Sequence, residues 1–368
     1  MKKIYIQPRI ETMATTPQQI LCASGGIKAQ ISGYKQNTGG GFSQSPFIWL
    51  AGVVCSSLLF LGTACSTNNT PDQPKQQAEL KPRTLIVTQT EEHTNQVAIR
   101  RLPQATITDE GETLNALWSR GDEISFRNMS HESYTDPQTD ALVPLDGVLL
   151  ADRTARIASF ASNDKVWCDV DDQILLVYPK ATAPAITVSG DPLQATYSIS
   201  LTGQDGTLAT IANTYHHSYG IATITEVTET TANAELAEMQ NLLTVCKFSF
   251  VDKDEPGTPL PITSLSISYN GGTYANTYPG TATVTVTQGT PCTATVTPDK
   301  KSTSAGGNPL TISPSGDLTE VYVALFPEAT ATTYSFSLTS GEDTYSGTAT
   351  ARLIAGEYVV ATGLKLTK

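Results

Sequence analysis

Hydrophobic and polar residues alternate with a period of two along much of the chain, which is the pattern of β-strands with one buried and one wet face. The alternation is clearest in Ser264–Asn270, Thr281–Thr287 and Cys292–Thr297, where apolar residues are separated by serine or threonine. Short antiparallel strands of this kind need a second layer to cover their apolar face. The C-terminal third is therefore predicted to be a β-sandwich.

Further strand-like runs, bounded by Gly, Pro, Asn and Asp, extend the β pattern toward the N-terminus. One stretch, Ala232–Leu243, instead has the composition of a helix and is expected to be helix-like. The remaining strands are expected at Leu85–Thr88, Glu123–Arg127, Ala155–Phe160, Gln173–Tyr178, Ala195–Leu201, Thr244–Val251, Thr319–Phe326, Thr333–Thr339, Tyr345–Ala351 and Tyr358–Lys368.

An uncharged run, Phe47–Cys65, precedes all of these strands and ends in the small residues Gly62-Thr63-Ala64 directly before Cys65. Small residues next to a cysteine are the pattern of a bacterial lipoprotein signal, in which Cys65 receives a lipid and becomes the new N-terminus. The alternatives are an uncleaved membrane anchor or an unlipidated signal. Each places residues 66–368 outside the cytoplasmic membrane, and lipid chains on Cys65 would hold the protein on the outer membrane at the cell surface.

The division of the chain follows from this leader and the strands. Residues 1–64 are expected to be the leader, although the first 46 lack the usual basic segment beside the apolar core, so the translation start stays open. Residues 65–83 are a polar tether with prolines at Pro71 and Pro74. Residues 84–245 and 246–368 are expected to form two β-sandwich domains.

Charge and cysteine content exclude several classes. The 368 residues carry 23 Lys+Arg against 35 Asp+Glu, a net charge of −12, which disfavours nucleic-acid binding because such binding depends on neutralising phosphates. Beyond the leader and the lipid site Cys65, only Cys168, Cys246 and Cys292 remain, an odd and widely spaced set that is neither a disulfide framework nor a zinc site. Cys246 is expected to be a small buried hydrophobe.

Candidate chemistry is sparse. The pair His216-His217 could contact a metal or a glycan, but an ordinary exposed loop is the favoured interpretation. Asp169-Val-Asp171-Asp172 lacks the alternating oxygen ligands and the glycine of a calcium loop, so a solvated strand entry is expected. Trp118 and Trp167 are expected in the core or covering an edge, although an exposed tryptophan could stack on a sugar. Catalytic motifs such as Gly-x-Ser-x-Gly are missing, so no enzyme activity, cofactor or metal is expected.

Several short motifs, in order, resemble those of the Bacteroidetes fimbrillin-like (FimA/Mfa-like) proteins. They are the Trp-x-x-Gly-Asp-x-Ile segment from Trp118 to Ile124, Tyr178-Pro179 after an apolar strand, the Gln-Asp-Gly within Tyr197–Leu208, the junction sequence LLTVCKFSF, and the closing Tyr345-Ser-Gly347 and Ala355-Gly356-Glu-Tyr358. The resemblance covers roughly residues 84–368. It implies an all-β fold of two tandem transthyretin-like Greek-key β-sandwiches and the role of a fimbrial subunit.

The resemblance also implies a maturation route. In that family the precursor travels as a lipoprotein, an Arg-specific protease removes its N-terminal segment, and a strand from the next subunit fills the groove that opens. Other fimbrial subunits are thus the implied partners, through donor-strand insertion. Arg83 is the first candidate for the cut because it follows the tether, Arg100 and Arg101 are second choices, and the alternative for Arg83 is an exposed linker cation.

The C-terminal run to Lys368 reads as the last strand of the domain, with no spare segment to act as a donor, which favours a tip or accessory subunit over a shaft subunit. The alternative function is a non-polymerising surface lipoprotein that binds host or bacterial glycans. A hydrolase carrying a β-rich accessory domain is a third and weaker interpretation.

Overall fold

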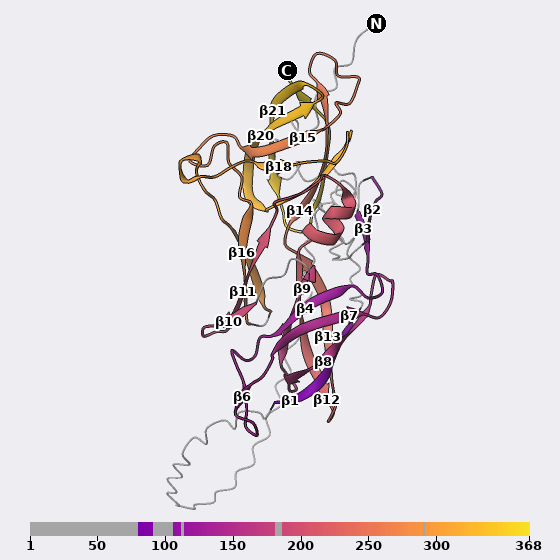
Figure 1. The fold of residues 1–368 in the computed structure, drawn as a ribbon, viewed down its shortest axis with the longest axis vertical. Helices are drawn as coiled ribbons and strands as arrows, with labels where there is room; N and C mark the ends of the chain where they lie inside the picture. Colours follow the sequence, from indigo (N-terminus) through magenta and orange to yellow (C-terminus); the bar gives the residue numbers. More distant parts are fainter. Residues whose placement is uncertain (1–79, 91–105, 112–113, 181–185, 290) are drawn as a thin grey trace, which may run out of the picture.

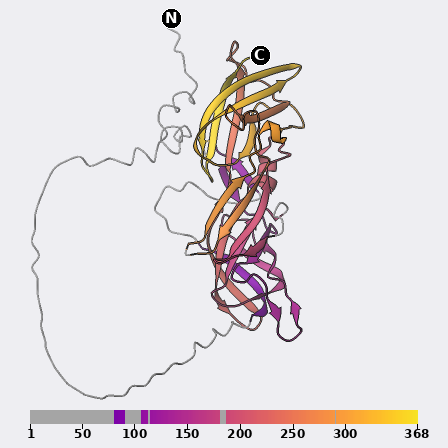
Figure 2. The same ribbon diagram turned by 90° about the vertical axis from the view of Figure 1, so that its left-hand side faces the viewer.

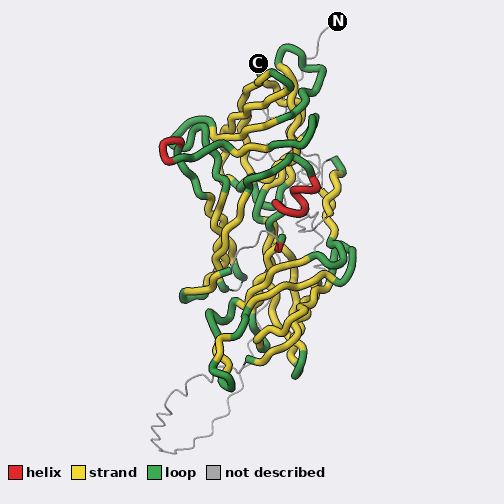
Figure 3. Tube along the Cα trace, in the orientation of Figure 1, coloured by secondary structure: helices red, strands yellow, loops and turns green. Residues whose placement is uncertain are grey.

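The computed structural model describes residues 80–90, 106–111, 114–180, 186–289 and 291–368. It is an elongated, almost entirely β molecule, so the all-β fold class predicted from the sequence is confirmed (Figures 1 and 3). Helical turns within the described residues are short: α4 (Leu208–Thr210) runs into the π-helical η3 (Ile211–Tyr215), and η4 (Thr303–Ala305) is a single 3-10 turn.

Seven strands close into a barrel at one end of the molecule, in the order β1-β13-β12-β9-β4-β7-β8. Its core is filled by buried side chains such as Leu85, Trp118, Phe126, Phe160 and Leu236. The strands are β1 (Lys81–Gln89), β4 (Glu123–Asn128), β7 (Asp146–Ala151), β8 (Ser159–Cys168), β9 (Gln173–Tyr178), β12 (Ser218–Val227) and β13 (Thr231–Asn241).

A small hairpin, β5 (Thr135–Asp136) with β6 (Ala141–Leu142), lies at the barrel end of the molecule (Figure 1). A second hairpin, β2 (Thr106–Asp109) with β3 (Leu114–Leu117), lies at the level of the helical segment.

The opposite end is a sandwich of two sheets. One sheet has the order β19-β14-β22 and the other β18-β15-β20-β21. Phe248 of the first sheet packs edge-on against Phe336 of the second, with ring centroids 5.4 Å apart. The strands are β14 (Thr244–Asp252), β15 (Ser264–Tyr269), β18 (Leu310–Ile312), β19 (Val321–Leu325), β20 (Glu328–Ser340), β21 (Asp343–Leu353) and β22 (Tyr358–Leu366).

A further four-stranded sheet joins chain segments that are far apart in sequence. Its order is β10 (Thr187–Ser189), β11 (Gln194–Ser200), β16 (Thr281–Thr287) and β17 (Thr293–Pro298). β11 and β16 pair antiparallel from Gln194 with Thr287 to Ser200 with Thr281, and the two strands run side by side along the length of the molecule (Figure 2). The predicted division between residues 245 and 246 falls at the start of β14. Strands from both sides of that division pair in the four-stranded sheet, β10 and β11 from the N-terminal side and β16 and β17 from the C-terminal side.

Two expectations from the sequence were wrong in detail. The helix-like Ala232–Leu243 is instead strand β13, in which Ala232, Ala234 and Leu236 face the barrel core and the backbone bonds to β1 and β12. Ladder pairing on both sides and burial every second residue outweigh the helix propensity of Ala, Glu and Leu. In the expected strand Ala155–Phe160, only the last two residues belong to β8, and Ala155 forms an isolated bridge with Trp118.

Candidate functional site

Strand β1 closes the barrel and is the candidate for exchange between subunits. It pairs parallel with β13, from Thr84 with Thr231 to Gln89 with Leu236, and antiparallel with β8, from Lys81 with Cys168 to Thr88 with Ser159. Without β1, the facing edges of β8 and β13 would have no ladder partner. Such unpaired edges are what an incoming strand recognises.

The sequence of β1 fits this position. Leu85 and Val87 are completely buried in the barrel core, whereas Ile86 between them is half-buried. Burying two such side chains stabilises the strand by about 1.5–3 kcal/mol each. The last residue, Gln89, is also buried and accepts a 3.3 Å hydrogen bond from Trp118 Nε1. Hydrophobic pockets and a polar end contact therefore fix the register of β1.

Arg83 lies inside β1, so the expectation of a linker arginine was wrong in placement, and so was the alternative of an exposed cation. Its side chain is buried, with Nε donating to the carbonyl of Thr228 at 2.8 Å and Nη1 donating to the carbonyl of Cys168. The carboxylate of Asp169 lies 3.9 Å away. Arg83 thus ties β1 to the ends of β8 and β12. Its role as a cleavage site stays a prediction.

The other elements of the predicted processing route lie outside the described residues. These are the leader, the lipidation site Cys65 and the second-choice arginines Arg100 and Arg101. Among the helices described, none has the length and apolar character needed to cross a bilayer.

Trp118 and Trp167 have separate structural roles. Trp118 is fully buried in the barrel, edge-on to Phe160 at 4.9 Å and to Tyr178 at 5.5 Å between ring centroids. It is therefore a core residue and unavailable for stacking on a sugar. Trp167 is half-buried and packs against Tyr134, with ring centroids 5.7 Å apart.

His216 and His217 are buried at the start of β12, which corrects the expectation of an exposed loop. Burial lowers the pKa of each imidazole to about 4, helped at His216 by the neighbouring His217 and opposed at His217 by a hydrogen bond to the backbone of Ser200. Both rings are therefore neutral near pH 7. Sequence reasoning missed this because flanking tyrosine and glycine are equally typical of a loop.

The acidic turn after β8 is partly solvated and partly structural. Asp171 is exposed with a φ of 66°, but Asp172 is buried and accepts hydrogen bonds from Asn128 Nδ2 at 2.8 Å and the Asp169 amide at 2.9 Å. Its other oxygen lies 3.0 Å from His131 Nε2. Across the described ranges, no group of three or more His, Cys, Asp or Glu is arranged to hold a metal ion.

The three cysteines in the described ranges are unpaired thiols. Cys246 is fully buried, which confirms its expected role as a small hydrophobe, and desolvation raises the pKa of its thiol. Burial likewise raises the pKa of Cys168 to about 11. Both thiols are therefore protonated and unreactive at neutral pH.

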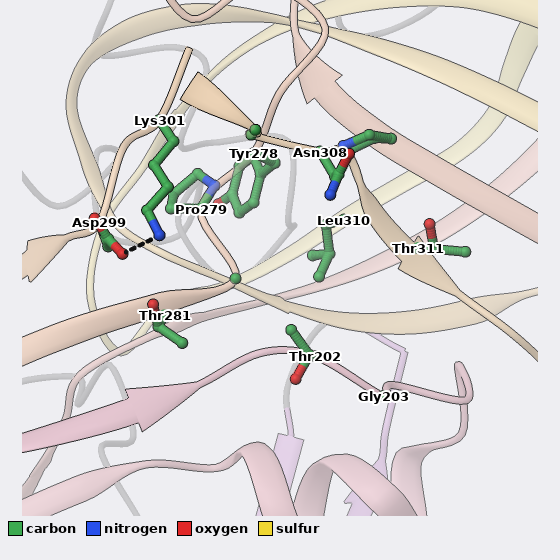
Figure 4. Close-up of a pocket in the computed structure, with 14 residues that line it drawn as sticks. Thr202, Gly203, Tyr278, Pro279, Thr281, Asp299, Lys301, Asn308, Leu310 and Thr311 are labelled. Atoms are coloured by element: carbon green, nitrogen blue, oxygen red, sulfur yellow. Dashed lines mark ion pairs between the residues drawn. The ribbon is translucent and has the colours of Figure 1, made fainter. Parts of the chain in front are cut away.

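A polar cleft of about 390 Å³ lies where the four-stranded sheet β10-β11-β16-β17 meets the sandwich (Figure 4). Residues of the segments 202–203, 278–281 and 299–311 line it. Asp299 and Lys301 are paired at 3.2 Å with about half of each side chain exposed. Thr281, Asn308 and Thr311 also line the cleft and carry side chains able to form hydrogen bonds. Sequence reasoning did not find this cleft because its residues are ordinary turn residues.

Comparisons with known proteins give a distant likeness in fold. No family model matches the sequence. No curated protein matches it either. Among solved structures, a Bacteroides ovatus protein described as a "putative cell adhesion protein" is 12% identical and covers 78% of this chain and 95% of its own, with a TM-score of 0.41. A Bacteroides eggerthii protein with the same description is 10% identical over 77% and 85% of the two chains, at 0.35. The shaft pilin SpaA of Lactobacillus rhamnosus GG is 11% identical over 77% and 97%, at 0.25.

Proposed function

We propose that this protein is a structural and adhesive subunit of a cell-surface fimbria, exported as a lipoprotein through Cys65 and assembled by strand exchange in which β1 is the strand replaced. The observation that carries the proposal is the place of β1 between β8 and β13, with Leu85 and Val87 filling the barrel core. An incoming strand with apolar residues at alternate positions would restore both the ladder and the core.

The chain order sets a condition on maturation. A cut after Arg83 would leave Thr84–Gln89 in the barrel, since the rest of β1 lies on its C-terminal side. A cut after Arg100 or Arg101 would separate all of β1 from the rest of the protein. Arg83 also requires β1 to open before a protease could reach it, because its side chain is buried. We therefore favour Arg100 or Arg101 as the cut that permits assembly.

The test is to express the full chain in a bacterium that exports lipoproteins and contains an Arg-specific surface protease. The mature N-terminus and the ladder of detergent-resistant polymers would be compared among wild type, Arg83→Lys, a double Arg100→Lys/Arg101→Lys variant and the exposed-arginine control Arg153→Lys. We expect only the double variant to retain β1 and to lose polymers. Polymers that form with an intact acylated Cys65 would contradict the proposal.

The position in the fibre, tip or accessory, stays a prediction from the sequence. So does the alternative of a glycan-binding lipoprotein. Burial of Trp118 and of the His216-His217 pair removes the two contacts first considered for a sugar. The cleft beside Asn308 offers hydrogen-bonding groups in their place. Binding of the full chain to a carbohydrate array that is lost in Asn308→Ala, in a protein that forms no polymers, would favour the alternative.

A further inference from the structure

The β2–β3 hairpin connects two barrel strands but packs on the sandwich. It follows β1 and precedes β4 in the chain, yet Ile107 and Ala116 are buried in the hydrophobic cluster that contains the sandwich core. Figure 1 shows the hairpin displaced from the barrel toward β14. The hairpin therefore packs against the sandwich core although the strands before and after it belong to the barrel.

A single carboxylate fixes the hairpin to the sheet β19-β14-β22. Asp109 Oδ2 accepts from Lys247 Nζ of β14 at 2.9 Å and from the Tyr322 hydroxyl of β19 at 2.6 Å. Asp109 Oδ1 accepts from the Gly111 amide at 2.7 Å, within the hairpin itself. The side chains of Asp109 and Lys247 are only 13% and 14% exposed. Lys247 also pairs with Glu320 at 2.9 Å.

The charges are held in their ionised forms. Burial would raise the pKa of Asp109, but the hydrogen bonds from Tyr322 and Lys247 outweigh it and lower that pKa. Burial would lower the pKa of Lys247, but its hydrogen bonds to Asp109 and Glu320 outweigh it and raise that pKa. Charged hydrogen bonds in a largely dry setting are stronger than those in water. The contact is thus maintained across the physiological pH range.

A hairpin with strands of four residues each has little stability of its own in water. Its order depends on docking, so it has two states: seated on the sandwich, or released and unfolded. The carboxylate makes the seated state specific, because its departure would remove one of the two carboxylates, Asp109 and Glu320, that pair with the largely buried Lys247.

We propose that the β2–β3 hairpin is a strap, latched by Asp109 on Lys247 and Tyr322, that keeps the chain ahead of β4 fastened to the sandwich when β1 leaves the barrel. The proposal rests on the proposed function, because the strap limits how much of the chain is released when β1 is exchanged. The residues up to the cut would be lost with β1, and the barrel seam would open without freeing the chain from β2 to β4. The strap would also exclude a foreign segment from the same face of β14.

The strap is tested by hydrogen exchange on the full chain, comparing wild type with Asp109→Asn and with the control Asp136→Asn. Asp136 makes only local contacts in the exposed hairpin β5–β6. Losing charged hydrogen bonds should reduce protection of the β2 and β3 amides about tenfold to a hundredfold, with β9 and β15 unchanged. Equal protection in Asp109→Asn and wild type would overturn the strap, and so would a uniform loss in all strands.

A double-mutant cycle guards against a variant that merely folds poorly. Lys247→Met and Tyr322→Phe should each weaken the protection of the hairpin amides from exchange. Combining Asp109→Asn with Lys247→Met should reduce the free energy of protection by less than the sum of the two single changes. Additive losses would show that Asp109 and Lys247 act separately and would overturn the latch. These measurements use the monomer, so the strap can fail while fimbriae still form, and assembly can fail while the strap is present.

Discussion

The side-chain amide of Gln204 hydrogen-bonds to both backbone groups of Ala324. The Ala324 amide donates to Gln204 Oε1 at 2.7 Å, and Gln204 Nε2 donates to the Ala324 carbonyl at 3.0 Å. Ala324 lies in β19, whose opposite edge pairs with β14. Gln204, which is 1% exposed, therefore replaces a neighbouring strand at one position of this edge. Capping of an edge in this way protects it from pairing with other chains.

We expect Gln204→Ala to destabilise the protein by about 2–4 kcal/mol, because it leaves two backbone groups of Ala324 buried without partners. Urea unfolding of the full chain measures the change. Gln204→Glu should also destabilise the protein, because a carboxylate at this buried position keeps an acceptor for the Ala324 amide but repels the Ala324 carbonyl and loses its hydration. The exposed Gln138→Ala is the control and should stay within about 0.5 kcal/mol of wild type. A similar small effect for Gln204→Ala would contradict the role of Gln204.

Gly206 closes the same loop against β19 and is the second test. It has a φ of +78°, and an added Cβ would lie 2.8 Å from Val321 Cγ1. Its carbonyl accepts from the Tyr322 amide at 2.8 Å, so the loop cannot easily withdraw. Gly306 has nearly the same φ, +79°, but open space around its Cα.

Comparing Gly206→Ala with Gly306→Ala therefore separates backbone strain from the clash. Both should lose about 1 kcal/mol from the positive φ, and Gly206→Ala should lose about 1–3 kcal/mol more from overpacking. Thermal and urea unfolding of both variants provide the comparison. Equal losses would mean that Val321 moves aside and that the loop packs loosely.

The fold was predictable where side chains alternate, and much less so where contacts between distant segments decide. Thr281–Thr287 was located to the residue because burial of one face gives a period of two, and Gln173–Tyr178 was located because a strand buried on both faces is a short continuous apolar run. β13 was missed because the helix propensity of its Ala, Glu and Leu residues outweighs any local strand signal, and its pairing with β1 lies far away in sequence. For the same reason nothing local identified Gln204 as an edge cap or Asp109 as a latch: the partners of each are more than a hundred residues away.

Acid should weaken the protein through His216 and His217. Their pKa values fall to about 4 in the folded protein, against about 6.5 in the unfolded chain. The unfolded chain therefore binds more protons between these values, so stability is full above about pH 6.5 and declines as the pH falls toward 4. The loss has an upper bound of about 3 kcal/mol for each histidine.

Urea unfolding at several pH values between 7.5 and 4.5 measures this decline. A double His216→Gln/His217→Gln variant should have a shallower pH dependence than wild type, whatever its stability at pH 7.5. Because the carboxylates are the same in both proteins, the difference between the two slopes of unfolding free energy against pH is due to the histidines. Parallel curves for the two proteins would contradict the prediction.

Arg83 should control how firmly β1 is held, independently of whether it is ever cleaved. Its guanidinium bridges the carbonyls of Thr228 and Cys168, which lie at the ends of β12 and β8. Arg83→Met keeps most of the apolar stem but leaves both carbonyls without this donor, so we expect a loss of about 1.5–3 kcal/mol. Arg83→Lys should lose less because it keeps one charged donor, although it cannot reach both carbonyls with one planar group.

Hydrogen exchange should place the loss in β1, β8 and β12, with the sandwich strands β15 and β20 unchanged. The control Arg153→Met, at an exposed site, should change neither region. A loss spread evenly over both ends of the molecule would instead mean that the barrel seam and the sandwich open together, and that β1 cannot leave alone.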